Sequence, residues 1–197
     1  MQAQLVARDI ACRRGDRLLF RGLDLTLLAG DAVHVRGPNG CGKTSLLRIL
    51  AGLLRPFAGA VERSASLGLV DDRCALPDSW TLGQALGFWS RIDRGPVPAA
   101  AAADRLGIAP LLHVPVRFLS TGQRRRAALA RLLGQSAQVW LLDEPFNGLD
   151  ADGETVLTGI LQAHRDAGGS VVLTAHRMLP LASSAVLDLP AHAPRCD

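Results

Sequence analysis

Tyrosine is absent from this sequence, and aromatic residues make up only 4% of its 197 positions. So few rings argue against a platform that stacks the bases of single-stranded nucleic acid. No run approaches the roughly 20 apolar residues that a membrane-spanning helix requires, and residues 1–8 lack the basic start and apolar core of a signal peptide. We therefore expect a cytoplasmic protein; if it works at a membrane, it needs a partner to cross it.

Cysteine is scarce and shows no pattern. The four cysteines have neither CxxC spacing nor a paired histidine cluster: they are Cys12, Cys41, Cys74 and Cys196. Cys41 lies inside a glycine-rich loop, where a disulfide would obstruct a binding site. We interpret all four as reduced thiols, as is usual in the cytoplasm.

Length and charge bound the remaining possibilities. A chain of 197 residues, 48% of them hydrophobic, suits one globular domain over residues 1–197 with room for a subdomain. The net charge of +4 reflects an arginine-biased composition, and we interpret it as a solvated surface rather than a nucleic-acid footprint. No nucleic-acid partner is therefore expected.

Lysine occurs once, at the point where the chain carries its clearest motif. Lys43 is the only lysine among 22 basic residues, and all the others are arginines. A position that departs from this bias indicates a site that needs a compact ammonium rather than a planar guanidinium fork.

Lys43 belongs to the stretch GPNGCGKTS, which spans residues 37–45. An alternating strand pattern precedes it at residues 31–36 and a helical pattern follows it, as in a phosphate-binding loop. Glycines let successive N–H groups point inward, and the positive end of the helix dipole adds to this anion site. We expect Lys43 to reach the β- and γ-phosphates and Thr44 to complete the coordination of Mg²⁺. The candidate nucleotide-binding residues are Gly37, Pro38, Asn39, Gly40, Cys41, Gly42, Lys43, Thr44 and Ser45.

The rest of the chain predicts an α/β fold. Strand patterns at residues 4–28 predict a small antiparallel sheet ahead of the loop, and another buried strand is expected at residues 66–70. Helical periodicity dominates residues 80–135, which we expect to form a helical subdomain. Strand, helix and strand patterns follow at residues 139–176, and no clear element follows Leu189.

A second helix start carries its own signal. Ser120 is followed three residues later by Gln123, just before an apolar periodic run, which is the pattern of a capping box. One interpretation is a well-capped helix with a charged first turn. The other is a second phosphate-binding helix end, flanked by Gly122.

Two acids end the apolar strand VWLL. Asp143 is expected to hold Mg²⁺ directly or through water, and Glu144 to polarise the water that attacks the γ-phosphate. The alternative is an ordinary acidic turn. His176 ends the next strand, and if the two strands are neighbours it could reach the γ-phosphate rather than being a simple turn residue.

These motifs together resemble the nucleotide-binding subunits of ABC transporters. GPNGCGKT is similar to the family's Walker A motif, LSTGQ (residues 119–123) to its signature, and VWLLDE to its Walker B motif. GLD (residues 148–150) resembles the D-loop, which adds Asp150, and His176 resembles the switch histidine. The resemblance implies a P-loop NTPase (RecA-like) core with an N-terminal antiparallel β subdomain and a helical signature subdomain.

The resemblance also implies ligands and assembly. ATP with Mg²⁺ would be held between Walker A of one subunit and the signature of another in a head-to-tail homodimer, with Ser120 and Gly122 touching the γ-phosphate. The chain departs from the family pattern in two loops. Asp71-Asp72-Arg73 stands where many members have a glutamine, and Arg13-Arg14 where many stack an aromatic residue on adenine; Arg14 could stack there instead.

Within the family, the chain is similar to the ATP-binding subunits of cytochrome c maturation systems, the haem exporter ATPases. LSTGQRRRAALARLL and VWLLDEPFNGLDADG carry this likeness. It implies an integral membrane permease subunit as partner, a peripheral place on the cytoplasmic side of the inner membrane, and a role in haem delivery. The alternatives are the ATPase of another transporter, a soluble ABC ATPase without a transport role, and a P-loop kinase, which would leave LSTGQ without a purpose.

Overall fold

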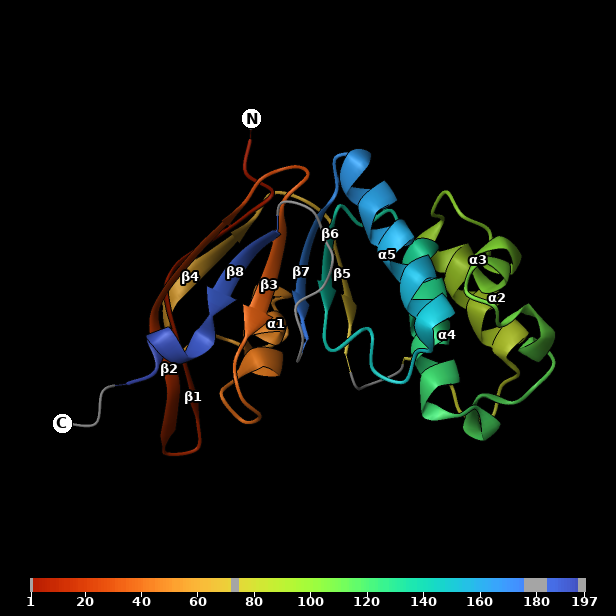
Figure 1. The fold of residues 1–197 in the computed structure, drawn as a ribbon, viewed down its shortest axis with the longest axis horizontal. Coiled ribbons are helices and arrows are strands. Elements are labelled where there is room, and N and C mark those ends of the chain that lie inside the picture. The colour runs from red at the N-terminus through yellow and green to blue at the C-terminus, as the bar shows by residue number, and fades with distance from the viewer. Residues whose placement is uncertain (1, 72–74, 176–183, 195–197) are drawn as a thin grey trace.

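Two sheets organise the chain, and the computed structural model describes it over residues 2–71, 75–175 and 184–194 (Figure 1). An antiparallel sheet has the strand order β2-β1-β4, and a parallel sheet has the order β5-β6-β7-β3-β8. The strands are β1 (Leu5–Arg14), β2 (Arg17–Leu27), β3 (Ala32–Arg36), β4 (Ala58–Arg63), β5 (Leu67–Val70), β6 (Val139–Leu142), β7 (Ser170–Thr174) and β8 (Ser184–Asp188).

The antiparallel sheet forms where the sequence predicts one, and it contains one strand that the sequence does not predict. β1 and β2 pair from Leu5↔Leu27 to Arg14↔Arg17. β4 is the unpredicted third strand, and it pairs with β1 although it reads as a mostly exposed Ala-Gly-Ala-Val run. Only glycine fits at position 59, because a Cβ there would lie 2.3 Å from the Asp9 carbonyl oxygen.

The parallel sheet separates two apolar cores, because successive side chains of a strand point to opposite faces. On β6, Val139 and Leu141 pack in the core shared with the antiparallel sheet and α1 (Lys43–Leu50). Trp140 and Leu142 pack in the other core, against the helices. Burial on both faces explains why β6 reads as a continuous apolar run.

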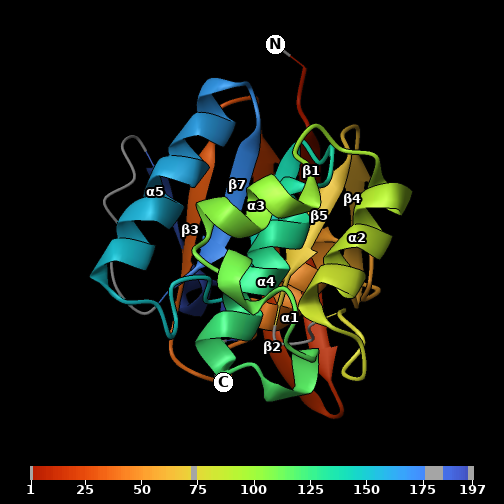
Figure 2. The same cartoon turned by 90° about the vertical axis from the view of Figure 1, so that its right-hand side faces the viewer.

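The second core is covered by helices, as Figure 2 shows. These are α2 (Leu82–Asp93), α3 (Ala99–Arg105), α4 (Thr121–Leu133) and α5 (Ala151–Asp166), with short 3₁₀ turns at Ala109–Leu111 and Val116–Phe118. α2, α3 and α4 pack on one another within the region where the sequence predicts a helical unit. None of the helices in the described ranges is both long and apolar enough to cross a membrane.

Strand order brings the carboxyl ends of three strands together. β6 lies between β5 and β7, with Val70 opposite Leu142 and Leu142 opposite Leu173. The predicted adjacency of the strands before Glu144 and before His176 is therefore confirmed. The chain's last strand, β8, was not predicted, and it pairs with β3 from Ala32↔Ser184 to Arg36↔Asp188. A 3₁₀ turn at Leu189–His192 follows it, where the sequence predicts no clear element.

A glycine substitution tests the packing of β5 against α4. In Gly68→Ala the new Cβ would lie 2.2 Å from Leu132 Cδ1, so either the buried leucine must repack or α4 must move away from β5, and we expect a loss of about 1–3 kcal/mol in the free energy of unfolding. Gly159→Ala on α5 meets nothing within 4 Å and should stabilise by about 0.5–1 kcal/mol. Urea unfolding followed by circular dichroism measures both changes. Equal stabilities of the two variants would contradict this packing.

Candidate functional site

A cavity of about 570 Å³ lies at the carboxyl ends of β3 and β6. Its wall combines the β1–β2 hairpin, the glycine-rich loop with the start of α1, and the end of β6. This is where ligands bind in open α/β sheets. The lining residues are Arg14, Arg17, Leu19, Asn39, Gly40, Gly42, Lys43, Thr44, Ser45, Asp143 and Glu144.

The glycine-rich loop has a backbone that ordinary residues cannot adopt. Gly42 caps α1 with φ 112° and lies so close to the hairpin that a Cβ would be 3.2 Å from the Phe20 ring. Gly37 has φ 149°, and its Cβ would lie 2.6 Å from Cys41 Sγ. The loop therefore folds back on itself in front of the helix. The first N–H groups of α1 have no intrahelical partners, as at the start of any α-helix.

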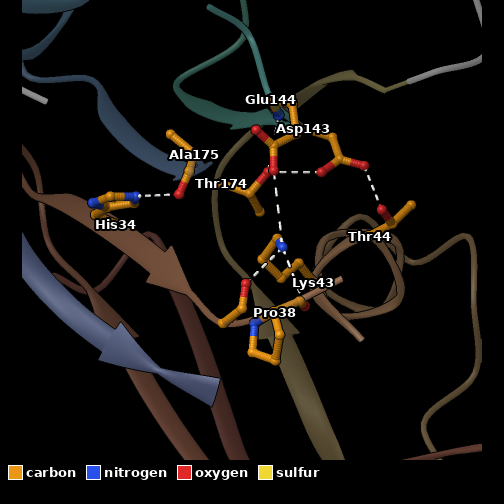
Figure 3. Close-up of polar contacts among 9 residues, drawn as sticks. His34, Pro38, Lys43, Thr44, Asp143, Glu144, Thr174 and Ala175 are labelled. Atoms are coloured by element: carbon orange, nitrogen blue, oxygen red, sulfur yellow. Dashed lines mark hydrogen bonds and ion pairs between the residues drawn. The ribbon is translucent and has the colours of Figure 1, made fainter. Parts of the chain in front are cut away.

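Lys43 is held inside this loop. Its side chain is buried, and Nζ donates to the carbonyl oxygens of Gly37 at 2.8 Å and Pro38 at 3.3 Å (Figure 3). Glu144 Oε1 lies 3.9 Å from the same nitrogen. An ammonium has three donors and no acceptor, so this arrangement holds it at the cavity wall, ready for an anion.

Asp143 links three elements through its carboxylate. Thr44 Oγ1 on α1 donates to Oδ2 at 2.5 Å, and Thr174 Oγ1 on β7 donates to Oδ1 at 2.7 Å (Figure 3). The carboxylate is buried, so these hydrogen bonds replace the water it loses. The hydroxyl of Thr44 and the carboxylate of Asp143 together form a pair of hard oxygen donors at the cavity.

Glu144 has an unusual backbone. Its φ is 50°, in the left-handed region that few non-glycine residues adopt, at a cost of order 1–2 kcal/mol. Its amide nitrogen donates to Thr174 Oγ1 at 2.9 Å, which helps to hold this conformation. The half-buried side chain consequently points into the cavity rather than continuing the strand's alternation.

Arginines replace the aromatic residue expected of a base-binding hairpin. Arg14 and Arg17 face each other at the end of the β1–β2 hairpin, are both exposed, and both line the cavity. Arg13 does not line it, because its guanidinium lies over the Phe57 ring, 4.6 Å from the centroid. The hairpin thus places Arg14, and not Arg13, on the cavity wall.

The predicted capping box is confirmed at the start of α4. Ser120 Oγ accepts from the Gln123 backbone nitrogen, and Gln123 Oε1 accepts from the Ser120 nitrogen. Ser120 is exposed, and Gly122 lies against the chain at Gly148, where a Cβ would be 2.5 Å from the carbonyl oxygen. Among the described residues that line the cavity, none belongs to this helix start.

Asp150 joins α4 to α5. Its Oδ1 accepts from the Gly153 nitrogen at 3.0 Å, which caps α5, and from Arg126 Nη2 at 2.7 Å. The Gly153 hydrogen bond and then the Arg126 charge hold the pKa of this carboxyl below its usual range. Asp150 therefore stays ionised and ties the two helix starts together.

The sequence reasoning missed two polar residues near the site, Arg48 and His34. Arg48 on α1 donates to Asp71 Oδ2 from Nε at 3.0 Å and from Nη2 at 2.8 Å, in a largely buried pair. His34 on β3 is buried, and its Nε2 lies 3.0 Å from the Ala175 carbonyl oxygen (Figure 3). The signal in the sequence was that each residue lies between apolar neighbours, His34 in a strand pattern and Arg48 in a helical pattern. His176 lies outside the described residues, as do Asp72 and Arg73.

The described cysteines agree with reduced thiols. Cys12 and Cys41 are both free. Burial raises the pKa of the Cys12 thiol, against a smaller opposite effect of its hydrogen bond with Ser45, so the group stays protonated at neutral pH. Cys12 packs in the core beneath the loop as a small apolar side chain.

Comparison with known proteins places this architecture in a family. The ABC transporter family model matches residues 20–147, which is more than half of the chain. The chain belongs to the ABC transporter family, and it is an ATP-binding, ATP-hydrolysing subunit of that family. The predicted fold class is confirmed with it.

Curated relatives narrow the comparison. A protein of Novosphingobium aromaticivorans, named "Cytochrome c biogenesis ATP-binding export protein CcmA", is 55% identical over 90% of this chain and 91% of its own length. A protein of the same name from Sphingopyxis alaskensis is 47% identical over 92% of this chain and 94% of its own. The predicted similarity to ATP-binding subunits of cytochrome c maturation systems is confirmed.

Solved structures share the fold. A putative metal-chelate type ABC transporter in an inward-facing conformation matches with a TM-score of 0.78 and 27% identity, over 95% of this chain and 80% of that chain. A putative ABC transporter ATP-binding protein from Pyrococcus furiosus matches with a TM-score of 0.81 and 23% identity, over 96% and 99% of the two chains. The second likeness supports the fold alone.

Loss of the single lysine tests the cavity as a phosphate site. Lys43→Ala removes a charge-assisted contact worth about 1.5–3 kcal/mol, so we expect the Kd for ATP to rise at least about tenfold. Arg55→Ala, which removes an exposed charge just beyond α1, is the matched control and should leave the Kd unchanged. A fluorescent ATP analogue titrated against each variant gives the Kd. Unaltered binding by Lys43→Ala would contradict the assignment.

Proposed function

We propose that this chain is the ATPase subunit of an ABC transporter complex in c-type cytochrome biogenesis, where it energises a separate membrane subunit that delivers haem. The observation that carries the proposal is the 55% identity to a curated cytochrome c biogenesis export ATPase over 90% of the chain. The whole of residues 1–197 would act as one ATPase domain, with a helical subdomain at about residues 80–135.

The cavity supports a division of labour for ATP hydrolysis. The N–H groups of the glycine-rich loop and Lys43 bind the β- and γ-phosphates, and Arg14 stacks on the adenine. Glu144 orients and polarises the attacking water from the end of β6. His176 would act at the γ-phosphate as well, since it follows β7, the strand beside β6.

The residues at the cavity fit a magnesium ion. Thr44 and Asp143 supply hydroxyl and carboxylate oxygens, which Mg²⁺ prefers, and they already lie 2.5 Å apart. Across the described ranges, no cluster of three or more His, Cys, Asp or Glu forms a self-sufficient metal site. The remaining ligands would therefore be phosphate oxygens and water. When bound, the ion neutralises charge on the β- and γ-phosphates.

A second copy of the chain supplies what the cavity lacks. Ser120 and Gly122 lie at a capped helix start outside the cavity of their own chain, and a helix N-terminus favours an anion. In a head-to-tail homodimer this helix start and Asp150 of one copy would cover the phosphates bound by the other. Hydrolysis would then release the closed dimer.

The membrane partner follows from the same relatives. An integral membrane permease subunit of the cytochrome c maturation system would hold the ATPase dimer at the cytoplasmic face of the inner membrane, as a peripheral subunit. Nothing in the charge pattern favours a nucleic acid as partner.

Dimer closure provides one test. Glu144→Gln should bind ATP but hydrolyse it at least about a hundredfold more slowly, and so accumulate an ATP-bound dimer. Ser120→Arg added to this variant should keep it monomeric, since the residue is exposed and the larger side chain blocks the facing copy. Multi-angle light scattering with ATP measures the mass of each.

The control for the dimer test is Ser64→Arg in the Glu144→Gln background, an exposed serine after β4 that should leave the dimer intact. Ser120→Arg also removes a helix cap worth about 1 kcal/mol, so thermal unfolding must confirm that the variant is folded. A folded Ser120→Arg variant that still dimerises with ATP would refute the sandwich.

Cells test the pathway. In a strain lacking this chain we expect no covalent haem on c-type cytochromes, with recovery by the wild-type gene and not by Lys43→Ala. Haem staining of membrane proteins after denaturing electrophoresis measures this. Normal cytochromes without the chain would leave the ATPase assignment standing and remove its pathway, in favour of another ABC transporter.

A further inference from the structure

Arg125 connects α4 to the residue that follows β6. It lies in the first turns of α4, and its Nη1 donates to the Asp143 carbonyl oxygen at 2.9 Å and to the Asp71 carbonyl oxygen at 3.3 Å. Both hydrogen bonds are partly buried. The same guanidinium therefore bridges the chain just beyond two neighbouring strands, β5 and β6.

The bond to Asp143 fixes one end of a particular peptide group. The carbonyl of Asp143 and the N–H of Glu144 belong to the same plane, and a planar trans peptide moves as one unit. Arg125 holds the carbonyl end at 2.9 Å, and Thr174 Oγ1 holds the N–H end at 2.9 Å. The plane is thus anchored from a helix on one side and from β7 on the other.

This peptide decides where the Glu144 carboxylate lies. Rotation about the bond between its nitrogen and Cα is set at φ 50°, a strained value that persists only where the surroundings over-determine it. If the Arg125 anchor were lost, the peptide could rotate toward a relaxed φ and swing the side chain away. The two anchors oppose this rotation at the peptide itself, while the Asn147 nitrogen, which donates to the Glu144 carbonyl oxygen at 3.1 Å, holds the other side of the residue.

The second contact of Arg125 stabilises its own position. The Asp71 carbonyl oxygen accepts a hydrogen bond from Arg125, and the Asp71 carboxylate accepts one from Arg48. The side chains of Arg48 and Asp71 are 15% and 9% exposed. Arg48 lies on α1, which begins with Lys43. Asp71, the first residue after β5, is therefore held between α1 and α4, and Arg125 contacts it from α4.

From these contacts we propose that Arg125 is a positioning residue for ATP hydrolysis, which makes the orientation of Glu144 depend on the place of α4. The proposal rests on the proposed function, in which Glu144 polarises the attacking water. It adds that a shift of α4 against the parallel sheet releases the peptide and slows hydrolysis, while the phosphate loop keeps its nucleotide. Arg125 touches neither nucleotide nor water in this role.

A purely structural arginine makes a different prediction. If Arg125 only stabilised the contact between α4 and the sheet, its loss would lower stability and leave turnover of the folded protein unchanged. If it positions Glu144, kcat should fall about 10- to 100-fold, the cost of small misplacements of reacting groups, with little change in nucleotide affinity.

The experiment compares Arg125→Gln and Arg125→Lys with Arg124→Gln in the complex purified with its membrane subunit. Arg124 is the matched control, because it is the adjacent arginine and its described bonds go to Asp78, Arg117 and Leu119, away from β6. We expect Arg125→Gln to lose kcat as above with a Kd for ATP within about threefold of wild type. Arg125→Lys should recover part of the rate, because an ammonium can reach one carbonyl, and Arg124→Gln should hydrolyse ATP at the wild-type rate.

Glu144→Gln separates the two proposals. Where Arg125 acts through Glu144, adding Arg125→Gln to Glu144→Gln should cause no further loss of kcat. A Glu144→Gln protein with wild-type turnover would overturn the role of Glu144 and, with it, this inference. An inactive Glu144→Gln protein beside an Arg125→Gln protein of wild-type kcat would overturn the role of Arg125 alone.

Discussion

The structure depends on the hydrogen bonds that converge on Asp143. This one buried carboxylate accepts from Thr44 on the phosphate-loop helix and from Thr174 on the neighbouring strand. A buried charge without partners would cost far more than these bonds contribute, so the three elements must meet in this register. Lys43 directly precedes Thr44, and Glu144 directly follows Asp143, so this junction also positions both of these residues at the cavity.

The start of α4 is linked to the start of α5, and both lie outside the cavity. The capping box of Ser120 and Gln123 closes the first turn of α4. Gly122 packs on Gly148, and Asp150 binds Arg126, so the starts of α4 and α5 form one connected edge. This edge is the surface that our proposed head-to-tail dimer would bring to the second copy.

The departures from the family pattern gain a physical meaning in the structure. At the loop where the family resemblance implies a glutamine, Asp71 does not line the cavity, and its carboxylate accepts two hydrogen bonds from Arg48 on α1. At the hairpin, where the resemblance implies an aromatic ring, Arg14 lies on the cavity wall. The sequence shows that Asp71 departs from the family pattern, but only the structure shows that its carboxylate binds Arg48.

The sequence by itself determined the local elements and the chemistry of their ends. GPNGCGKTS, the capping box and the acids after VWLL each predicted a structure, because glycine torsions, helix caps and buried-strand patterns are local constraints. Long-range pairing decided the rest. β4 and β8 carry weak strand patterns and exist because β1 and β3 offer them free edges. His34, Arg48 and Arg125 have roles only through partners far away in the chain, since a side chain's hydrogen bonds depend on the elements that tertiary packing brings beside it.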